Sequence, residues 1–328
     1  MDASTSSETR FLHAIELGLG ALAWGDRLLW QYGRGYTEAD VRAAFDVSLE
    51  EGIRFIDTAE AYGQGRSERL LGQFIRESQQ PVLVATKFMP FPWRLVKESL
   101  LRALRHSLER LGLEAIDLYQ IHWPFPPVPT DTWMDGMAEA VKLGLTRTVG
   151  VSNYSQTLML RAYLALARHN IQLASNQVEY HLLDRSVEKN GLLARCQELG
   201  VRLIAYSPLA KGLLTGKYAP ENPPPGIRGP QFAGLLAKIQ PLLKLMMQIG
   251  QDHGGKTPAQ IALNWLICKG ARPIPGAKNA AQAQQNAGAL GWRLTPEQVA
   301  ALDEASNLFA KQRPGQHGDQ HRNQSTPA

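Results

Sequence analysis

The sequence contains little cysteine, no long apolar run and no block of like charge. Its two cysteines, Cys196 and Cys268, both lie in segments with a helical pattern. Their spacing matches neither a disulfide framework nor a cysteine-based metal site. We therefore expect both thiols to pack as small apolar side chains, and we expect the protein to work in a reducing compartment.

The longest apolar stretches are too short to cross a bilayer, and the polar first ten residues do not resemble a secretory signal. The 35 basic and 30 acidic residues give a net charge of +5 and are scattered along the chain. This scatter is a poor match to a nucleic-acid surface, although it is compatible with an anionic small ligand. We expect a soluble, cytoplasmic protein without nucleic-acid or membrane partners.

The chain has 328 residues, of which 44% are hydrophobic, so it can form one large domain or two modest ones. Short apolar segments alternate with helical patterns, which predicts a parallel sheet covered by helices. The strands are expected at residues 15–22, 54–57, 81–86, 115–121, 146–151, 171–175, 201–205 and 272–274. Eight such strand–helix units favour a single-domain (β/α)8 TIM barrel.

An open doubly wound sheet is the alternative fold. It would normally carry a glycine-rich dinucleotide turn after its first strand, and Gly18-Leu19-Gly20 lacks the third glycine. We therefore assign residues 1–310 to the barrel, which ends in an extra C-terminal helix at residues 295–309. Residues 311–328 are polar, with Gly and Pro, and we expect this tail to be disordered.

The segment 52–65 combines a strand with two groups that handle protons. Its apolar run stops at Asp57, and Tyr62 follows within one loop, before Gly63 and Gly65. An acid at a strand end with a tyrosine just beyond it fits a proton-transfer pair, but taken alone it is more often an ordinary loop. The other strand ends have to decide between these two interpretations.

In a TIM barrel the active site lies at the carboxyl ends of the strands. Polar residues there include Lys87, His122, the Ser152-Asn153 pair and Gln177. Each has an ordinary alternative: Lys87 as a solvated strand end, His122 as a loop histidine, Asn153 as a helix cap. Their occurrence together with an acid and a tyrosine is what points to chemistry.

These residue types fit the reduction of a carbonyl group. A phenol is too weak an acid near neutral pH, and a neighbouring ammonium lowers its pKa by favouring phenolate. Lys87, held by Asp57, is expected to do this for Tyr62, which then gives a proton to the carbonyl oxygen. His122 is expected to orient the carbonyl. No side chain supplies hydride, so a nicotinamide cofactor is required.

The sequence resembles the aldo-keto reductase family over residues 17–302. The motifs that carry the resemblance are Gly52-Ile-Arg-Phe-Ile-Asp-Thr-Ala-Glu-Ala-Tyr-Gly, Ala85-Thr-Lys, Asp117-Leu-Tyr-Gln-Ile-His, Gly150-Val-Ser-Asn, Asn176-Gln-Val-Glu-Tyr, Ala205-Tyr-Ser-Pro-Leu and Ile274-Pro-Gly-Ala. Two features, Phe91-Pro-Trp-Arg and Ile274-Pro-Gly-Ala-Lys-Asn-Ala, are similar to the branch found in cyanobacteria and plant plastids.

The resemblance implies a catalytic tetrad of Asp57, Tyr62, Lys87 and His122, with Tyr62 as the general acid. It also implies that NADPH lies extended across the barrel mouth. The residues that match cofactor contacts are Ser152, Asn153 and Gln177 for the carboxamide, Tyr206 for the nicotinamide ring, Ser207, Leu209, Gly212 and Lys217 for the pyrophosphate, and Gly276, Lys278, Gln282, Gln285 and Asn286 for the adenosine end.

One departure bears on the cofactor. Gln282 stands where many members carry an arginine for the adenosine 2′-phosphate, and Lys278 is a candidate to supply the positive charge instead. We favour NADPH (NADP) over NADH as the cofactor.

The aromatic residues of the predicted loops bear on the substrate. Trp24, Trp30, Trp93 and Trp123 lie on predicted loops at the mouth, where each is a candidate pocket residue and could equally serve in packing. A pocket lined by them would suit an apolar or aromatic aldehyde, and the resemblance to plant relatives suggests pyridoxal. The rival interpretations are a regulatory nucleotide-binding barrel subunit with little turnover and a metal-assisted barrel enzyme. The first is disfavoured by the intact tetrad, and the second has only two strand-end candidates, Asp57 and His122. We expect a monomer or a weak oligomer.

Overall fold

The computed structural model describes residues 12, 14–27, 30–225 and 228–309. The predicted disordered tail and the start of the chain lie outside these residues. Within them, no helix is long and apolar enough to cross a membrane. The same described residues contain no group of three or more His, Cys, Asp or Glu side chains arranged to hold a metal ion.

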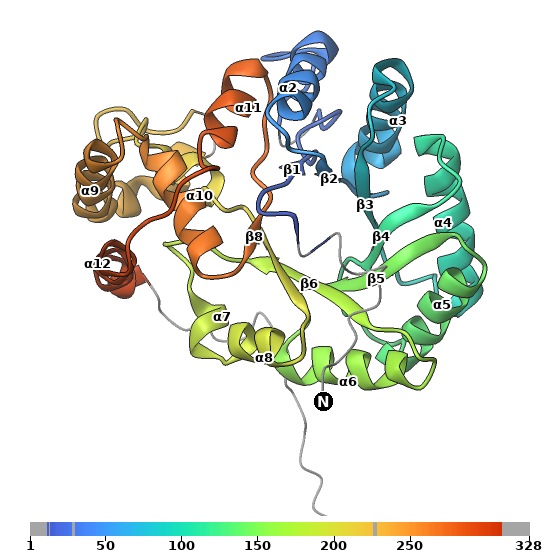
Figure 1. The fold of residues 1–328 in the computed structure, drawn as a ribbon. Helices are drawn as coiled ribbons and strands as arrows, with labels where there is room; N and C mark the ends of the chain where they lie inside the picture. The colour runs from blue at the N-terminus through green and yellow to red at the C-terminus, as the bar shows by residue number, and fades with distance from the viewer. Residues whose placement is uncertain (1–11, 13, 28–29, 226–227, 310–328) are drawn as a thin grey trace, which may run out of the picture.

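The described chain forms a sheet of eight parallel strands in sequential order, surrounded by helices (Figure 1). The strands are β1 (Leu19–Gly20), β2 (Phe55–Asp57), β3 (Leu83–Phe88), β4 (Ile116–Ile121), β5 (Thr146–Ser152), β6 (Leu173–Glu179), β7 (Arg202–Tyr206) and β8 (Arg272–Pro273). This confirms the predicted (β/α)8 TIM barrel.

The barrel is closed by hydrogen bonds between its first and last strand segments. Gly18 N–H donates to Pro273 O at 3.0 Å, and Gly20 N–H donates to Pro275 O at 2.9 Å. A Cβ on Gly20 would lie 2.9 Å from the carbonyl oxygen of Ile274. Glycine is therefore required at this seam so that the two backbones can approach each other.

The helices cover the outside of the sheet. They are α2 (Glu38–Glu50), α3 (Arg66–Ser78), α4 (Lys97–Leu111), α5 (Thr130–Lys142), α6 (Gln156–Ala167), α7 (Ser186–Lys189), α8 (Leu192–Glu198), α9 (Arg228–Asp252), α10 (Pro258–Cys268), α11 (Ala280–Ala287) and α12 (Pro296–Ser306). Short 3-10 helices follow β2 (Tyr62–Gly65), β7 (Ala210–Thr215) and α12 (Asn307–Phe309).

Several helix starts follow the chemistry of the sequence. Thr37 precedes α2, and its backbone N–H donates to the Asp40 carboxylate at 2.7 Å, which forms a capping box. Thr257 and Thr295 cap α10 and α12 in the same manner, each followed by a proline in the first turn. Local side-chain chemistry thus fixes where these three helices begin.

Three expected elements differ from the structure. The helical sequence pattern over residues 187–199 would fit a single helix, but the structure divides it into α7 and α8, because Gly191 adopts a left-handed backbone with φ of 75°. The strand predicted over 15–22 pairs regularly only at Leu19–Gly20. Finally, the helical pattern that starts at Arg94 in the sequence forms a helix only from Lys97, since Arg94 lies in a turn and its backbone N–H donates to Phe91 O.

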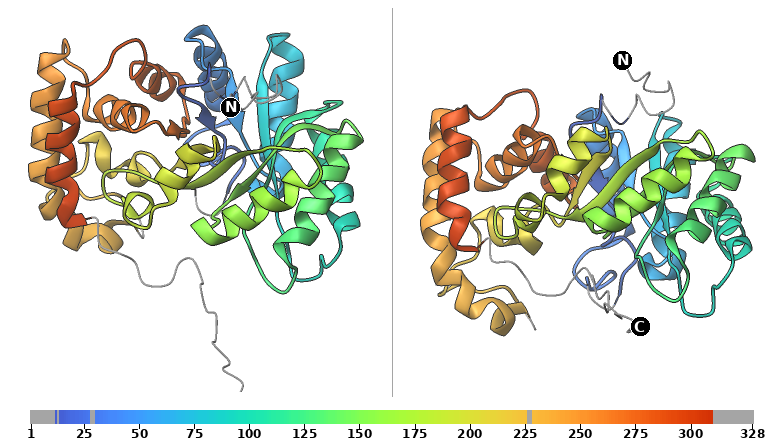
Figure 2. Two further views of the ribbon diagram at one scale, coloured as in Figure 1. Left: turned by 60° about the horizontal axis from the view of Figure 1, so that its bottom comes forward. Right: turned by 90° about the horizontal axis from the view of Figure 1, so that it is seen from below.

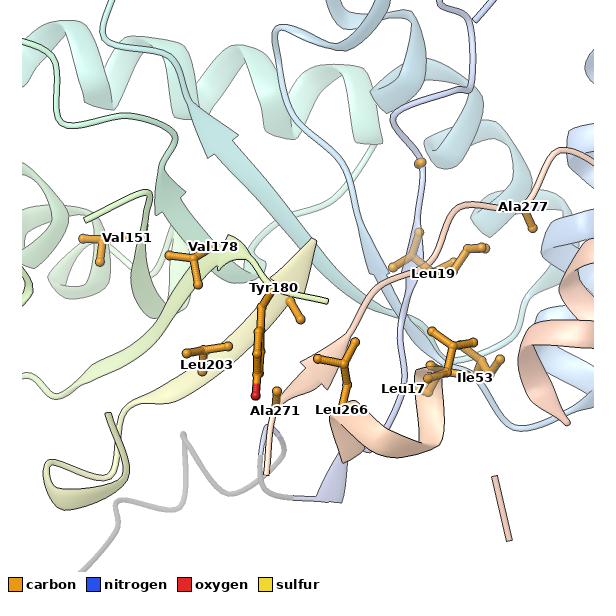
Figure 3. Packing of buried hydrophobic residues seen from close by; sticks show 14 of the residues in the cluster. Leu17, Leu19, Ile53, Val151, Val178, Tyr180, Leu203, Leu266, Ala271 and Ala277 are labelled. Atoms are coloured by element: carbon orange, nitrogen blue, oxygen red, sulfur yellow. The ribbon is translucent and has the colours of Figure 1, made fainter. Parts of the chain in front are cut away.

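The core has two layers. A small apolar cluster fills the barrel and takes residues from almost every strand or its flank: Leu12, Phe55, Ala85, Leu118, Ala174, Ile204 and Ile274. A larger cluster packs the outer strand faces and flanking segments against the helices; Figure 3 shows part of it around Leu203, Tyr180 and Leu266. The inner apolar layer ends where polar side chains begin, at the carboxyl ends of the strands.

Helices α9 and α12 lie beside each other outside the ring of helices that covers the sheet (Figures 1 and 2). The Asp303 carboxylate on α12 accepts from the Trp265 indole N–H at 2.9 Å and from the Lys269 ammonium at 2.9 Å, both contributed by α10 or its end. The extra C-terminal helix expected at 295–309 is therefore present and is docked on the barrel by polar contacts.

A stability prediction follows from the packing of α3 on the end of α4. A Cβ on Gly72 would lie 2.4 Å from the backbone oxygen of Leu111, which cannot move independently of its helix. We expect Gly72→Ala to lower the free energy of unfolding by about 1–3 kcal/mol, as overpacking does. The measurement is denaturant unfolding followed by circular dichroism.

The matched control is Gly234→Ala on α9, where no atom lies within 4 Å of the new methyl group. Because alanine restricts the unfolded chain and favours helix, this change should stabilise by about 0.5–1 kcal/mol. Equal effects of the two substitutions would contradict the close contact assigned to Gly72.

Candidate active site

A buried ion pair joins the ends of β2 and β3. The Lys87 ammonium, with no exposed surface, contacts the Asp57 carboxylate, which is 2% exposed. The same ammonium donates to the Thr58 carbonyl oxygen at 2.7 Å and to the Tyr62 hydroxyl oxygen at 3.2 Å. All three donors of the ammonium are therefore used, and each partner comes from β2 or the loop after it.

Tyr62 reaches Lys87 because its loop turns sharply. Tyr62 begins the 3-10 helix, and Gly63 and Gln64 have left-handed backbones with φ of 54° and 57°. A Cβ on Gly63 would lie 2.8 Å from the carbonyl oxygen of Gly25, on the loop after β1. Glycine thus lets the Tyr62 loop pack directly against a neighbouring loop at the barrel mouth.

Burial and neighbouring charges decide whether Lys87 and Tyr62 carry a proton. Burial alone would lower the pKa of Lys87, but the Asp57 carboxylate and Tyr62 raise it overall, so the ammonium stays charged. Burial raises the pKa of Tyr62, and the Lys87 ammonium offsets only part of this rise. The expected lowering of the Tyr62 pKa is therefore wrong for this structure, because burial of the phenol outweighs its cationic neighbour.

His122 follows β4 and lies against Tyr62. The two rings meet edge to face with centroids 5.6 Å apart. Burial, with a smaller contribution from the Lys87 ammonium, lowers the pKa of His122 to about 3. Its Nδ1 is buried and has no hydrogen-bond partner within the described part of the chain. At neutral pH the ring is thus an uncharged imidazole with one N–H, which suits it to donate a hydrogen bond to a ligand.

Two amide side chains hold the other oxygen of Asp57. Gln177 Nε2 donates to Asp57 Oδ2 at 2.8 Å, and Gln120 Nε2 does so at 3.3 Å. Gln177 was expected at the site from the sequence, whereas the fully buried Gln120 was not. The available signal was strand alternation, because Gln120 lies two residues before His122 and shares its side of β4.

The predicted carboxamide and ring contacts form one hydrogen-bonded chain at the ends of β5, β6 and β7. The Tyr206 hydroxyl donates to Asn153 Oδ1 at 3.0 Å, Asn153 Nδ2 donates to His122 O at 3.0 Å, and Ser152 donates to Gln177 O at 2.8 Å. Asn153 has a left-handed backbone with φ of 62°, an unusual conformation that clusters at functional sites. Gln177, whose side chain binds Asp57, links this chain to the Asp57–Lys87 pair.

The predicted pyrophosphate segment lies directly after β7. Its residues surround the 3-10 helix Ala210–Thr215, with left-handed backbone at Ser207, Ala210, Lys211 and Gly212. Leu209 is half-buried, and the exposed Lys217 lies with its ammonium 4.8 Å from the Tyr218 ring. This curved segment therefore brings a cation close to Gly212, as a phosphate contact would require.

The predicted adenosine-end residues gather at β8 and α11. The ammonium of Lys278 lies 4.8 Å from the Trp30 ring and 4.5 Å from the Tyr36 ring. Around it, side-chain bonds fix the segment: Gln282 Oε1 accepts from Lys278 N, Asn286 Nδ2 donates to Gly276 O, and Gln285 Nε2 donates to Thr257 Oγ1. The loop after β1 is thus tied to the loop after β8 through Lys278.

The four tryptophans have different positions. Trp24 is fully buried, donates its indole N–H to Ala277 O at 2.9 Å and packs edge-on against Phe74. Its assignment to the pocket surface is wrong, because the β1 loop folds it back into the core. Trp93 is 73% exposed and stacks on Phe91.

Trp123, the residue after His122, is half-buried and stacks on Phe125 with the rings 5° from parallel. Trp30 contacts Lys278 as described above. Two stacked aromatic pairs therefore lie in the loops at the mouth. Phe91 and Trp93 follow β3, which carries Lys87, and Trp123 and Phe125 follow β4 and His122.

The chain is similar to known proteins of one family. The model of the aldo/keto reductase family matches residues 16–307. A chloroplastic pyridoxal reductase from Arabidopsis thaliana is 41% identical over 313 residues, which cover 92% of this chain and 85% of the relative.

Solved structures agree. Glycerol dehydrogenase AKR11B4 from Gluconobacter oxydans is 27% identical and superimposes with a TM-score of 0.79, covering 92% of this chain and 94% of that one. An aldo-keto reductase from Klebsiella pneumoniae, in complex with NADPH, is 30% identical, with a TM-score of 0.72 and the same coverage of both chains.

The lowered pKa of His122 predicts a pH dependence of stability. In the unfolded chain this histidine is protonated below about pH 6.5, whereas in the folded protein it is protonated only below about pH 3. The free energy of unfolding therefore decreases as the pH falls from 6.5 towards 3, because only the unfolded chain takes up this proton. We expect the free energy of unfolding to decrease less between pH 7 and pH 5 in His122→Gln than in the native protein, measured with urea. Parallel decreases would show that His122 does not resist protonation.

Proposed function

The chain belongs to the aldo/keto reductase family, and we propose that Asp57, Tyr62, Lys87 and His122 are its catalytic residues. The protein is an NADPH-dependent oxidoreductase that reduces aldehyde and ketone carbonyls to alcohols. The observation that carries the assignment of the four residues is the contact of the Tyr62 hydroxyl with the Lys87 ammonium at 3.2 Å, next to the His122 ring.

Each of these residues has a distinct task in the proposed reaction. Tyr62, which its raised pKa keeps protonated, donates the proton to the carbonyl oxygen. The Lys87 ammonium stabilises the negative charge that develops on the phenol oxygen, and Asp57 holds the ammonium in place. The neutral His122 donates a hydrogen bond that orients the carbonyl. When bound by the cofactor residues, a nicotinamide would supply the hydride.

The predicted cofactor residues fit NADPH by their chemistry. Ser152, Asn153 and Gln177 present hydroxyl and amide groups for a carboxamide, and the Tyr206 ring lies beside them. Lys217 and Lys278 supply the cations that phosphates need. Because Gln282 carries no charge, Lys278 is the cation that would bind the 2′-phosphate by which NADPH differs from NADH.

For the substrate we propose a planar aromatic aldehyde, with pyridoxal as the first compound to test. The relative from Arabidopsis is named a pyridoxal reductase, and two stacked aromatic pairs follow the strands of Lys87 and His122. Flat rings favour offset stacking with an aromatic ligand.

We also propose a cytoplasmic, monomeric or weakly associating protein. Both cysteines are free in the described structure, which suits a reducing compartment. The Arabidopsis relative is named chloroplastic, so fractionation of source cells has to separate these two compartments. Light scattering of the purified protein tests the oligomeric state.

The central test is Tyr62→Phe. Removing the phenolic proton while keeping the ring should reduce kcat for aldehyde reduction by about 10²–10⁴-fold, the usual contribution of general acid catalysis. The Kd for NADPH, followed by protein fluorescence, should stay within about twofold of the native value. Undiminished turnover in Tyr62→Phe would refute the proposed role. NADPH binding by the native protein without turnover of any aldehyde would instead support a regulatory subunit.

The substrate proposal predicts a preference for aromatic aldehydes. Stacking contributes about 0.5–1.5 kcal/mol, which corresponds to about 2–10-fold in kcat/KM for pyridoxal or benzaldehyde over propanal. Trp123→Ala should remove this preference while the Kd for NADPH stays unchanged. Equal kcat/KM values for aromatic and aliphatic aldehydes in the native protein would contradict the aromatic pocket.

A further inference from the structure

The backbone pairing of β2 with β3 stops before the catalytic tyrosine. Regular register ends at Asp57 opposite Ala85, and Thr58 N–H still donates to Ala85 O at 2.8 Å. The next backbone contact, Glu60 N–H to Lys87 O, is stretched to 3.5 Å. Tyr62, two residues further, is therefore attached to the end of β3 mainly by side chains.

Besides Lys87, which binds Thr58 O and the Tyr62 hydroxyl, the side chain that makes this attachment is Glu60. It is 8% exposed, and its Oε1 accepts from the backbone N–H of Met89 at 2.7 Å, two residues after Lys87. Arg94 binds the same carboxylate with both terminal nitrogens, one of them at 3.1 Å to Oε2. Such two-pronged ion pairs fix both distance and orientation.

Arg94 is itself held in place on several sides. Its guanidinium donates to Met89 O at 2.8 Å and lies 5.0 Å from the Phe88 ring and 5.1 Å from the Phe91 ring. Its side chain is 20% exposed. The Glu60–Arg94 pair thus joins the loop that carries Tyr62 to the loop after the strand that carries Lys87.

We propose that Glu60 and Arg94 are positioning residues for the carbonyl reduction. The pair holds the 58–62 loop over the end of β3 and so sets the separation between the Tyr62 hydroxyl and the Lys87 ammonium. Because displacement by about 1 Å can cost about 100-fold in rate, a tie at this point acts on kcat. This proposal rests on the role of Tyr62 proposed above.

The test compares Arg94→Gln, Glu60→Gln and the double variant. Each single variant should lower kcat for benzaldehyde about tenfold or more, while the Kd for NADPH stays within about twofold. Since both residues act through one contact, the double variant should be no slower than the slower single variant. Arg94→Lys, which keeps the charge, should recover part of the rate. If Arg94→Gln does not fold, Arg94→Lys takes its place in the comparison with the native protein.

A second readout separates positioning from loss of structure. If Tyr62 is the acid, the rate of reduction should fall at the alkaline pH where Tyr62 loses its proton. If the ammonium moves away from the phenol, the pKa of Tyr62 rises further, so this alkaline limb of kcat should move to higher pH in the variants. A variant that is only less stable would keep the alkaline limb of kcat at the pH of the native protein.

The matched control is Arg147→Gln at the opposite end of the strands. Arg147 pairs with Asp117, whose carboxylate also accepts a backbone N–H, that of Val84 at 2.8 Å. This control should leave kcat within about twofold of the native value.

The proposal is overturned if Arg147→Gln slows the reaction as much as Arg94→Gln, if the folded variants keep the native kcat, or if the single effects multiply in the double variant. Tyr62→Phe, assayed alongside, tells the cases apart: full activity there refutes the proposed acid, whereas its loss with active Glu60 and Arg94 variants refutes only the positioning role.

Discussion

The buried ion pair between Lys87 and Asp57 is the constraint on which the site depends. Removing two charges from water costs several kcal/mol per ion, so a pair of this kind persists only when its hydrogen-bonding capacity is filled. Here the ammonium has three partners, and the second carboxylate oxygen accepts from Gln120 and Gln177. Satisfying the ion pair thus fixes the strand ends around it.

The same burial sets three protonation states that serve one reaction. Lys87 remains an ammonium because Asp57 compensates for its desolvation, Tyr62 remains a phenol, and His122 remains a neutral imidazole. Each group therefore carries a proton that it can share in a hydrogen bond. The sequence suggested that the lysine would make the phenol more acidic, but it could not reveal how deeply the phenol is buried.

The sequence predicted the parts of the molecule that depend on periodicity and on local chemistry. Alternating apolar segments predicted the barrel, and the polar residue at each strand end predicted which side chains meet. Glu60 and Arg94 were missed because they lie 34 residues apart in loops, where no periodicity indicates a contact. Trp24 was misplaced for a similar reason, since its burial depends on how the β1 loop folds onto Ala277.

The short strand β2 explains why loops matter so much at this site. It has three residues, so regular backbone pairing with β3 ends at Asp57 and cannot position the tyrosine five residues later. Beyond that point the attachment passes to side chains: Lys87 binds Thr58 O, and Glu60 binds Met89 N–H and Arg94. The barrel core below determines that the strands are parallel and close together. The geometry of proton transfer is determined above it, by a few charged contacts that substitutions can remove while leaving the apolar core of the fold intact.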